Sequence, residues 1–144
     1  MYLLDTNILV YLIRGQAIGL AIDSHFNLRA GLHRCVISVV TVGEMLALVR
    51  NWKWGPKKVG ELQQLLGQIV WIDINHPDIL EAYGAPEEIN HTVGHTMGKN
   101  DVWIAATAKV SGSTLITSDG DFDHLSPTHI TRTRIDASTG NPLP

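Results

Sequence analysis

The chain has 144 residues, of which 44% are hydrophobic and 17% are charged. This length and composition suit one folded domain with its own core, and they exclude a disordered chain. The formal net charge is −3, so overall charge does not indicate a nucleic-acid-binding protein. The single cysteine, Cys35, cannot form an internal disulfide, which favours a reducing compartment. No apolar stretch approaches the roughly 20 residues of a membrane span, and the N-terminal segment lacks the basic start of a secretory signal. We therefore expect a cytoplasmic protein without a membrane segment.

Short apolar segments alternate with segments of helical pattern along the chain. We predict strands at residues 2–4, 35–37, 69–72 and 114–117, all buried, and a weaker fifth strand within 130–135. The pattern predicts helices at 6–13, 19–33, 40–51, 56–66, 77–91 and 100–111. Short apolar strands that alternate with helices are typical of a parallel sheet covered on both faces. The sequence therefore predicts a three-layer α/β/α domain over residues 1–135, with a central parallel sheet of four to five strands. The polar residues 136–144 are expected to form a flexible tail.

Acidic residues follow the predicted strands. Asp5 comes directly after the first strand, Glu44 lies shortly after the second, and Asp119 and Asp121 follow the fourth. Asp101 lies at the start of the helix before the fourth strand. Ligands of parallel α/β sheets bind at the carboxyl ends of the strands, near the point where the strand order reverses. We therefore expect these carboxylates to gather at one edge of the sheet.

Each acid also has a purely structural interpretation. Asp5 could cap the helix that starts near Thr6, Asp101 could interact with the N-terminus of its own helix, and Glu44 could reach solvent from an otherwise apolar helix. Several carboxylates at the ends of different elements are nevertheless unusual, because clustered carboxylates repel one another unless a divalent cation holds them. Oxygen ligands suit Mg²⁺ or Mn²⁺ better than zinc. Such a site fits metal-dependent hydrolysis of a phosphodiester.

Four segments carry a resemblance to a known family. They are LLDTN at 3–7, SVVTVGE at 38–44, KNDVWIAATA at 99–108 and LITSDGDF at 115–122. In their order and spacing, over about residues 2 to 125, they resemble the PIN-domain ribonucleases. Within that family they resemble the VapC-type toxins of bacterial type II toxin–antitoxin pairs.

The resemblance implies a parallel α/β/α fold and an Mg²⁺- or Mn²⁺-dependent endoribonuclease that acts as a toxin. It also implies an RNA substrate, a homodimer and inhibition by a small antitoxin protein. Carried over position by position, it implies a set of four catalytic acids, Asp5, Glu44, Asp101 and Asp119. The same four acids, together with Asp121, would bind the metal, and either Asp119 or Asp121 could be the principal fourth acid. Asn7 and Thr117 occupy supporting polar positions.

A basic segment with two tryptophans lies outside these motifs. Residues 50–58 read RNWKWGPKK and contain four cations and no acid. Aromatic rings interleaved with cations suit single-stranded RNA, through base stacking and phosphate attraction. An exposed elbow with tryptophan anchors would equally suit a dimer or antitoxin interface, which is the interpretation we favour. The candidate RNA or partner contacts are Arg50, Trp52, Lys53 and Trp54.

Two other functions compete with a nuclease. An aspartyl phosphatase of the haloacid-dehalogenase type also begins with a strand that ends in Asp, but it needs a second Asp two residues later, where this chain has Asn7. A non-catalytic RNA-binding or assembly module on the same fold should have lost one of the four acids, and none is missing. His91 and His95 have the spacing of a zinc helix but lack the Glu of a His-Glu-x-x-His motif, so we do not expect zinc there.

Overall fold

A computed structural model describes residues 1–85 and 97–144 of the chain. Its strands are β1 (Tyr2–Leu4), β2 (Cys35–Ser38), β3 (Val70–Ile72), β4 (Thr114–Thr117) and β5 (Arg132–Arg134). Its α-helices are α1 (Thr6–Arg14), α2 (Ala17–Phe26), α3 (Val39–Asn51), α4 (Pro56–Leu66), α5 (Pro77–Gly84) and α6 (Lys99–Ser111). Two short 3₁₀ helices are η1 (Leu32–Arg34) and η3 (Gly120–Leu125). Within the described ranges, no helix is long and apolar enough to cross a membrane.

The five strands form one parallel sheet in the order β3-β2-β1-β4-β5. In the centre, Leu3 of β1 is in register with Val36 of β2 on one side and with Leu115 of β4 on the other. The chain builds outward from β1 through β2 to β3, and then crosses back to add β4 and β5. The strand order therefore reverses between β1 and β4, which is where ligand sites form in such sheets. The predicted parallel sheet is confirmed.

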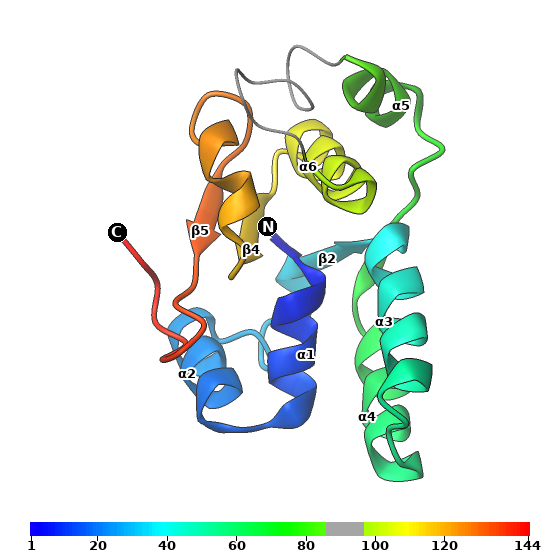
Figure 1. Ribbon diagram of the computed structural model, residues 1–144, viewed down its shortest axis with the longest axis vertical. Helices are drawn as coiled ribbons and strands as arrows, with labels where there is room; N and C mark the ends of the chain where they lie inside the picture. Colours follow the sequence, from blue (N-terminus) through cyan, green and yellow to red (C-terminus); the bar gives the residue numbers. More distant parts are fainter. Residues whose placement is uncertain (86–96) are drawn as a thin grey trace.

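Hydrophobic cores lie on both faces of this sheet, because successive strand residues point to opposite sides. Leu4 belongs to a core with α1, α2, α3 and α4, whereas its neighbour Leu3 belongs to a second core with α5 and α6. Figure 1 shows α5 and α6 on the side of the sheet opposite to α1 and α2. This arrangement confirms the predicted three-layer α/β/α fold.

The structure corrects two of the predicted elements. The helix predicted at 19–33 begins at Ala17 and ends at Phe26, because Asn27 adopts a left-handed conformation (φ 51°) that stops the helix. The strand predicted as buried at 69–72 is an edge strand, in which Val70 and Trp71 are 60% and 49% exposed. The helix predicted at 77–91 is described as far as Gly84, and the remainder, with His91 and His95, lies outside the described residues.

The last nine residues, which we expected to form a flexible tail, turn back onto the domain. The N–H of Asp136 donates to the carbonyl of Asn141 (2.9 Å), and the N–H of Leu143 donates to the carbonyl of Arg134 (2.8 Å). Gly140 lies so close to Ile18 of α2 that an added Cβ would meet the Ile18 carbonyl at 2.6 Å. The tail therefore makes specific contacts, while the division of the chain at residue 135 stays a prediction.

Candidate active site

Asp5 lies at the carboxyl end of the central strand β1 and is almost fully buried (4% exposed). Its side chain accepts three hydrogen bonds: from the N–H of Thr6 (2.7 Å), Nδ2 of Asn7 (2.8 Å) and Oγ1 of Thr117 (2.6 Å). The bond to Thr6 makes Asp5 the N-cap of α1, so the structural interpretation of this residue is correct. The same three donors also hold its carboxylate in one orientation at the end of the sheet.

Asn7 and Thr117 connect the end of β1 to the end of β4. The Asn7 side chain donates to Asp5 and accepts a hydrogen bond from the N–H of Ser118 (3.1 Å). The Thr117 hydroxyl donates to Asp5 and accepts a hydrogen bond from the N–H of Asp119 (2.9 Å). These two polar residues therefore position Asp119 relative to Asp5.

Glu44, on α3, is held by two side chains from other helices. Thr6 Oγ1 of α1 donates to its Oε1 (2.6 Å), and Asn100 Nδ2 of α6 donates to its Oε2 (3.2 Å). Neither side chain caps its own helix, because Asp5 and Gly98 occupy the cap positions of α1 and α6. The signal for their role was present, because each is next to a predicted site acid within the quoted motifs.

Three acids form a group that could hold a metal ion. Asp101 at the start of α6, Asp119 after β4 and Asp121 in η3 each offer an oxygen, and these oxygens lie within 4.8 Å of one another. The turn that carries the last two acids is closed by the N–H of Asp121, which donates to Oδ1 of Asp119 (2.9 Å). An all-oxygen set of this kind suits Mg²⁺ or Mn²⁺.

Four of the acids share a pocket of about 340 Å³, which is lined by Asp5, Glu44, Asp101 and Asp119. Burial raises the pKa of Asp5 to about 6, even though hydrogen bonds from Thr117 and Thr6 act in the opposite direction. Burial, and after it the charges of the neighbouring carboxylates, raise the pKa of Asp101 to about 7. Carboxyl groups that repel one another in this way favour a bound divalent cation.

The structure separates the four residues singled out in the basic segment. Trp52, which is 45% exposed, lines the acidic pocket, whereas Trp54 packs against the core on the α1 side of the sheet. Arg50 and Lys53 are exposed and are not among the pocket-lining residues.

Two further residues that were not predicted from the sequence, Tyr11 and Arg14, line the same pocket. The guanidinium carbon of Arg14 lies 4.8 Å from the centre of the Trp52 ring. Their signal was the spacing 7, 11 and 14, which places three residues on one face of α1.

The protein is therefore an α/β domain with a candidate divalent-metal centre at the carboxyl ends of β1 and β4, where the strand order reverses. The model of the PIN domain family matches residues 2–126, and the chain belongs to this family. Ribonuclease VapC2 of Haemophilus influenzae is 28% identical over 118 residues, which cover 82% of this chain and 86% of that protein.

Solved structures show the same fold. VapBC2 from Rickettsia felis, bound to a DNA fragment from its promoter, superposes with a TM-score of 0.72 at 24% identity, over 92% of this chain and 97% of that one. FitAcB from Neisseria gonorrhoeae gives a TM-score of 0.68 at 25% identity, over 92% and 96% of the two chains. The family resemblance inferred from the motifs is confirmed.

Proposed function

We propose that this protein is a divalent-metal-dependent endoribonuclease that acts as a VapC-type toxin of a toxin–antitoxin pair. The observation that carries the proposal is the convergence of Asp101, Asp119 and Asp121 within 4.8 Å, beside a pocket that Asp5 and Glu44 also line. The similarity to a protein named Ribonuclease VapC2 supports RNA as the substrate class.

In this proposal Asp101, Asp119 and Asp121 hold Mg²⁺ or Mn²⁺, and Asp5 and Glu44 complete the acidic site. Such an ion activates water and stabilises the charge that develops on the phosphodiester. Because burial raises the pKa values of Asp5 and Asp101, these groups release protons as the site takes up a cation.

Neighbouring side chains give the acids their orientation. Asn7 and Thr117 orient Asp5, while Thr6 and Asn100 orient Glu44, so the acids are positioned before substrate binds. This preorganisation is what an electrostatically catalysed reaction requires.

The proposed partners are an RNA substrate, a small antitoxin protein and a second copy of the chain, in the cytoplasm. Support for the antitoxin comes from the similar VapBC and toxin–antitoxin complex structures. Exposed apolar side chains on α3, β3 and α5 provide surface for protein contacts: Leu46, Val70 and Leu80. Light scattering measures whether the chain is a dimer, and co-purification with the product of a neighbouring reading frame tests the antitoxin.

The test of activity uses purified protein and a labelled single-stranded RNA, in chelator and in millimolar Mg²⁺. The proposal expects cleavage only with Mg²⁺, and at least about 100-fold less cleavage with Asp101→Asn. RNA binding without cleavage in either condition would indicate a non-catalytic module instead. Hydrolysis of a phosphomonoester would indicate a phosphatase, although Asn7 uses its amide to bind Asp5 and supplies no second acid.

A further inference from the structure

The pocket that contains the acidic site has a second, aromatic and cationic part. Tyr11 and Arg14 of α1 and Trp52 at the end of α3 line it together with the acids. Trp52 is 45% exposed at the edge of the pocket, with the Trp54 ring tilted beside it at 6.1 Å between ring centres. The acidic part of the pocket repels phosphate, so a neighbouring cation is needed where an RNA chain enters.

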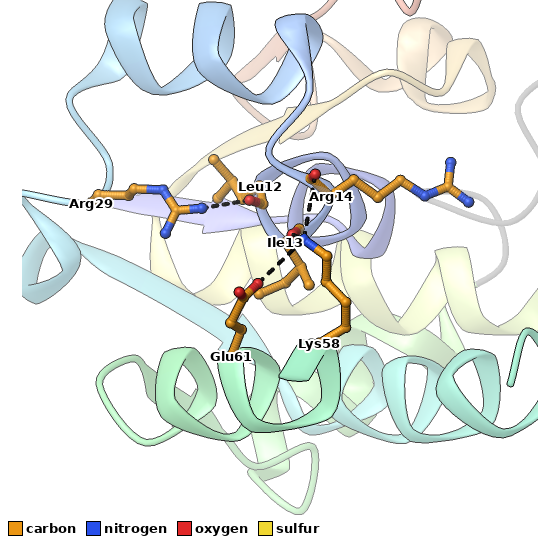
Figure 2. Close-up of polar contacts among 6 residues, drawn as sticks. All are labelled: Leu12, Ile13, Arg14, Arg29, Lys58 and Glu61. Carbon is orange, nitrogen blue, oxygen red and sulfur yellow. Dashed lines mark hydrogen bonds and ion pairs between the residues drawn. The ribbon is translucent and has the colours of Figure 1, made fainter. Parts of the chain in front are cut away.

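Arg14 is placed to supply that cation. Its guanidinium lies over the Trp52 ring at 4.8 Å, within cation–π distance, and its side chain is exposed. Figure 2 shows the side chain of Arg14 extending away from Lys58 and Glu61, while its backbone stays with the end of α1. Lys58 Nζ contacts the carbonyls of Ile13 (2.7 Å) and Arg14 (3.5 Å), which ties this end of α1 to α4.

The backbone that carries Trp52 is also well supported. Its N–H donates to the carbonyl of Leu48 (2.8 Å) at the end of α3. Lys53 then adopts a left-handed conformation (φ 52°), which turns the chain so that Trp54 packs into the core. One tryptophan therefore anchors the elbow, and the other remains exposed at the pocket.

We propose that Trp52 and Arg14 form a nucleotide subsite, in which one base of single-stranded RNA stacks on the Trp52 ring and the adjacent phosphate pairs with Arg14. Stacking on tryptophan tolerates any base, and an arginine beside it attracts the backbone. The subsite shares its pocket with the acids, so it would hold the RNA chain next to the phosphodiester that is cleaved. This inference rests on the proposed function for its assumption that RNA is the substrate.

The test is fluorescence anisotropy with a labelled 12-nucleotide single-stranded RNA of mixed sequence, with Ca²⁺ replacing Mg²⁺ to hold back cleavage. We expect Trp52→Ala to weaken binding by about 10-fold, equivalent to about 1.4 kcal/mol. Trp52→Phe keeps an aromatic face and should stay within about threefold of the unmodified protein. Trp71→Ala is the matched control, because Trp71 is similarly exposed (49%) but lines a different pocket, and it should bind RNA normally.

Arg14 and the RNA itself provide independent measurements. Arg14→Gln should weaken binding at low salt and make the plot of log affinity against log salt shallower by about 0.7, the loss of one contact to a single strand. Single abasic substitutions, each of which removes one base from the RNA, should identify one position that matters. Removal of that base should weaken binding to the unmodified protein but not to the Trp52→Ala protein. That coupling is absent if the tryptophan acts only through folding.

Several outcomes would overturn the subsite. Equal RNA affinity for Trp52→Ala and the unmodified protein would do so, as would an equal loss in Trp71→Ala. If the Trp52→Ala protein binds RNA normally but no longer dimerises or no longer binds its antitoxin, this surface is a protein interface. Cleavage that depends on Mg²⁺ could be lost in Asp101→Asn and yet be unchanged in Trp52→Ala and Arg14→Gln. That result would support the nuclease proposal and contradict the subsite. A chain that never cleaves RNA, but shows the expected Trp52 coupling, would leave the subsite standing without the nuclease.

Discussion

The pKa of Asp101, at about 7, is raised further than that of Asp5, at about 6. Burial is the largest cause of its raised pKa, followed by the charges of Asp5, Asp119, Glu44 and Asp121. A carboxyl group with a pKa of about 7 is partly protonated at neutral pH, so a metal ion must compete with a proton for it.

Asp101→Asn tests this residue in catalysis. The change keeps the size of the side chain and removes its charge, so we expect RNA cleavage to fall by at least about 100-fold, as metal and electrostatic effects dominate such reactions. Single-turnover cleavage at saturating Mg²⁺ is the measurement. Asp78→Asn, at an exposed position of α5, should cleave normally. Near-normal activity of Asp101→Asn would remove Asp101 from the catalytic site.

At the scale of single elements, the elbow after α3 contains two tryptophans, separated by Lys53, that have different roles. Trp54 packs against the core, while Trp52 lies at the pocket with nearly half of its surface exposed. We expect Trp54→Ala to lower the free energy of unfolding by about 2 to 3 kcal/mol, and Trp52→Ala by less than about 1 kcal/mol. Urea denaturation of both variants measures the difference. If both variants lose the same free energy of unfolding, the two tryptophans contribute equally to the stability of the fold.

The packing of α2 on α1 depends on a glycine. A Cβ at Gly19 would lie 2.1 Å from the carbonyl oxygen of Tyr11, whereas a Cβ at Gly60 of α4 would meet nothing within 4 Å. We therefore expect Gly19→Ala to destabilise the protein by about 1 to 3 kcal/mol through overpacking. Gly60→Ala should stabilise it by about 0.5 to 1 kcal/mol, because alanine favours a helix. Thermal melts of the pair decide this, and a stabilised Gly19→Ala would mean that the two helices are less closely packed.

At the scale of the whole molecule, the sheet topology concentrates negative charge at one edge, and this should affect stability. The pKa values of Asp5 and Asp101 in the folded protein, about 6 and about 7, lie above their ordinary value of 3.8. The folded state therefore binds protons more tightly than the unfolded state. The cost of the cluster is fully present above about pH 7 and is relieved as the pH falls through these two values.

Thermal melts in chelator and in millimolar Mg²⁺ test that cost. We expect Mg²⁺ to raise the melting temperature at pH 8, because it binds only the folded site, and to raise it less at pH 6, where protons compete. Asp101→Asn should be more stable than the unmodified protein in chelator at pH 8, by an amount on the order of 1 kcal/mol, and should lose most of its response to Mg²⁺. The opposite result has two parts: Mg²⁺ leaves the melting temperature of the unmodified protein unchanged, and Asp101→Asn is less stable than the unmodified protein in chelator. That result would mean that these acids serve only as caps and surface groups.

The sequence by itself determined the fold class, the strand positions and the convergence of the acids, because these depend on local patterns. Short apolar segments that alternate with helical ones specify a parallel sheet, and residues that directly follow its strands must meet at one edge. The positions of Asp5, Glu44, Asp101 and Asp119 relative to the predicted strands placed all four near this edge from the chain alone, and the family motifs added their expected catalytic roles. Their catalytic roles stay a prediction.

Only the tertiary structure decided which side chains share the site and which surfaces remain open. Thr6 and Asn100 bind Glu44 rather than capping their own helices, and these contacts span 38 and 56 residues of sequence. The same is true of Arg14 over Trp52, and of Val70 and Trp71, which are exposed on the edge strand β3. Local pattern records how polar or apolar a residue is. It does not record which distant element packs beside that residue, and it is this packing that selects a hydrogen-bond partner or leaves a ring exposed.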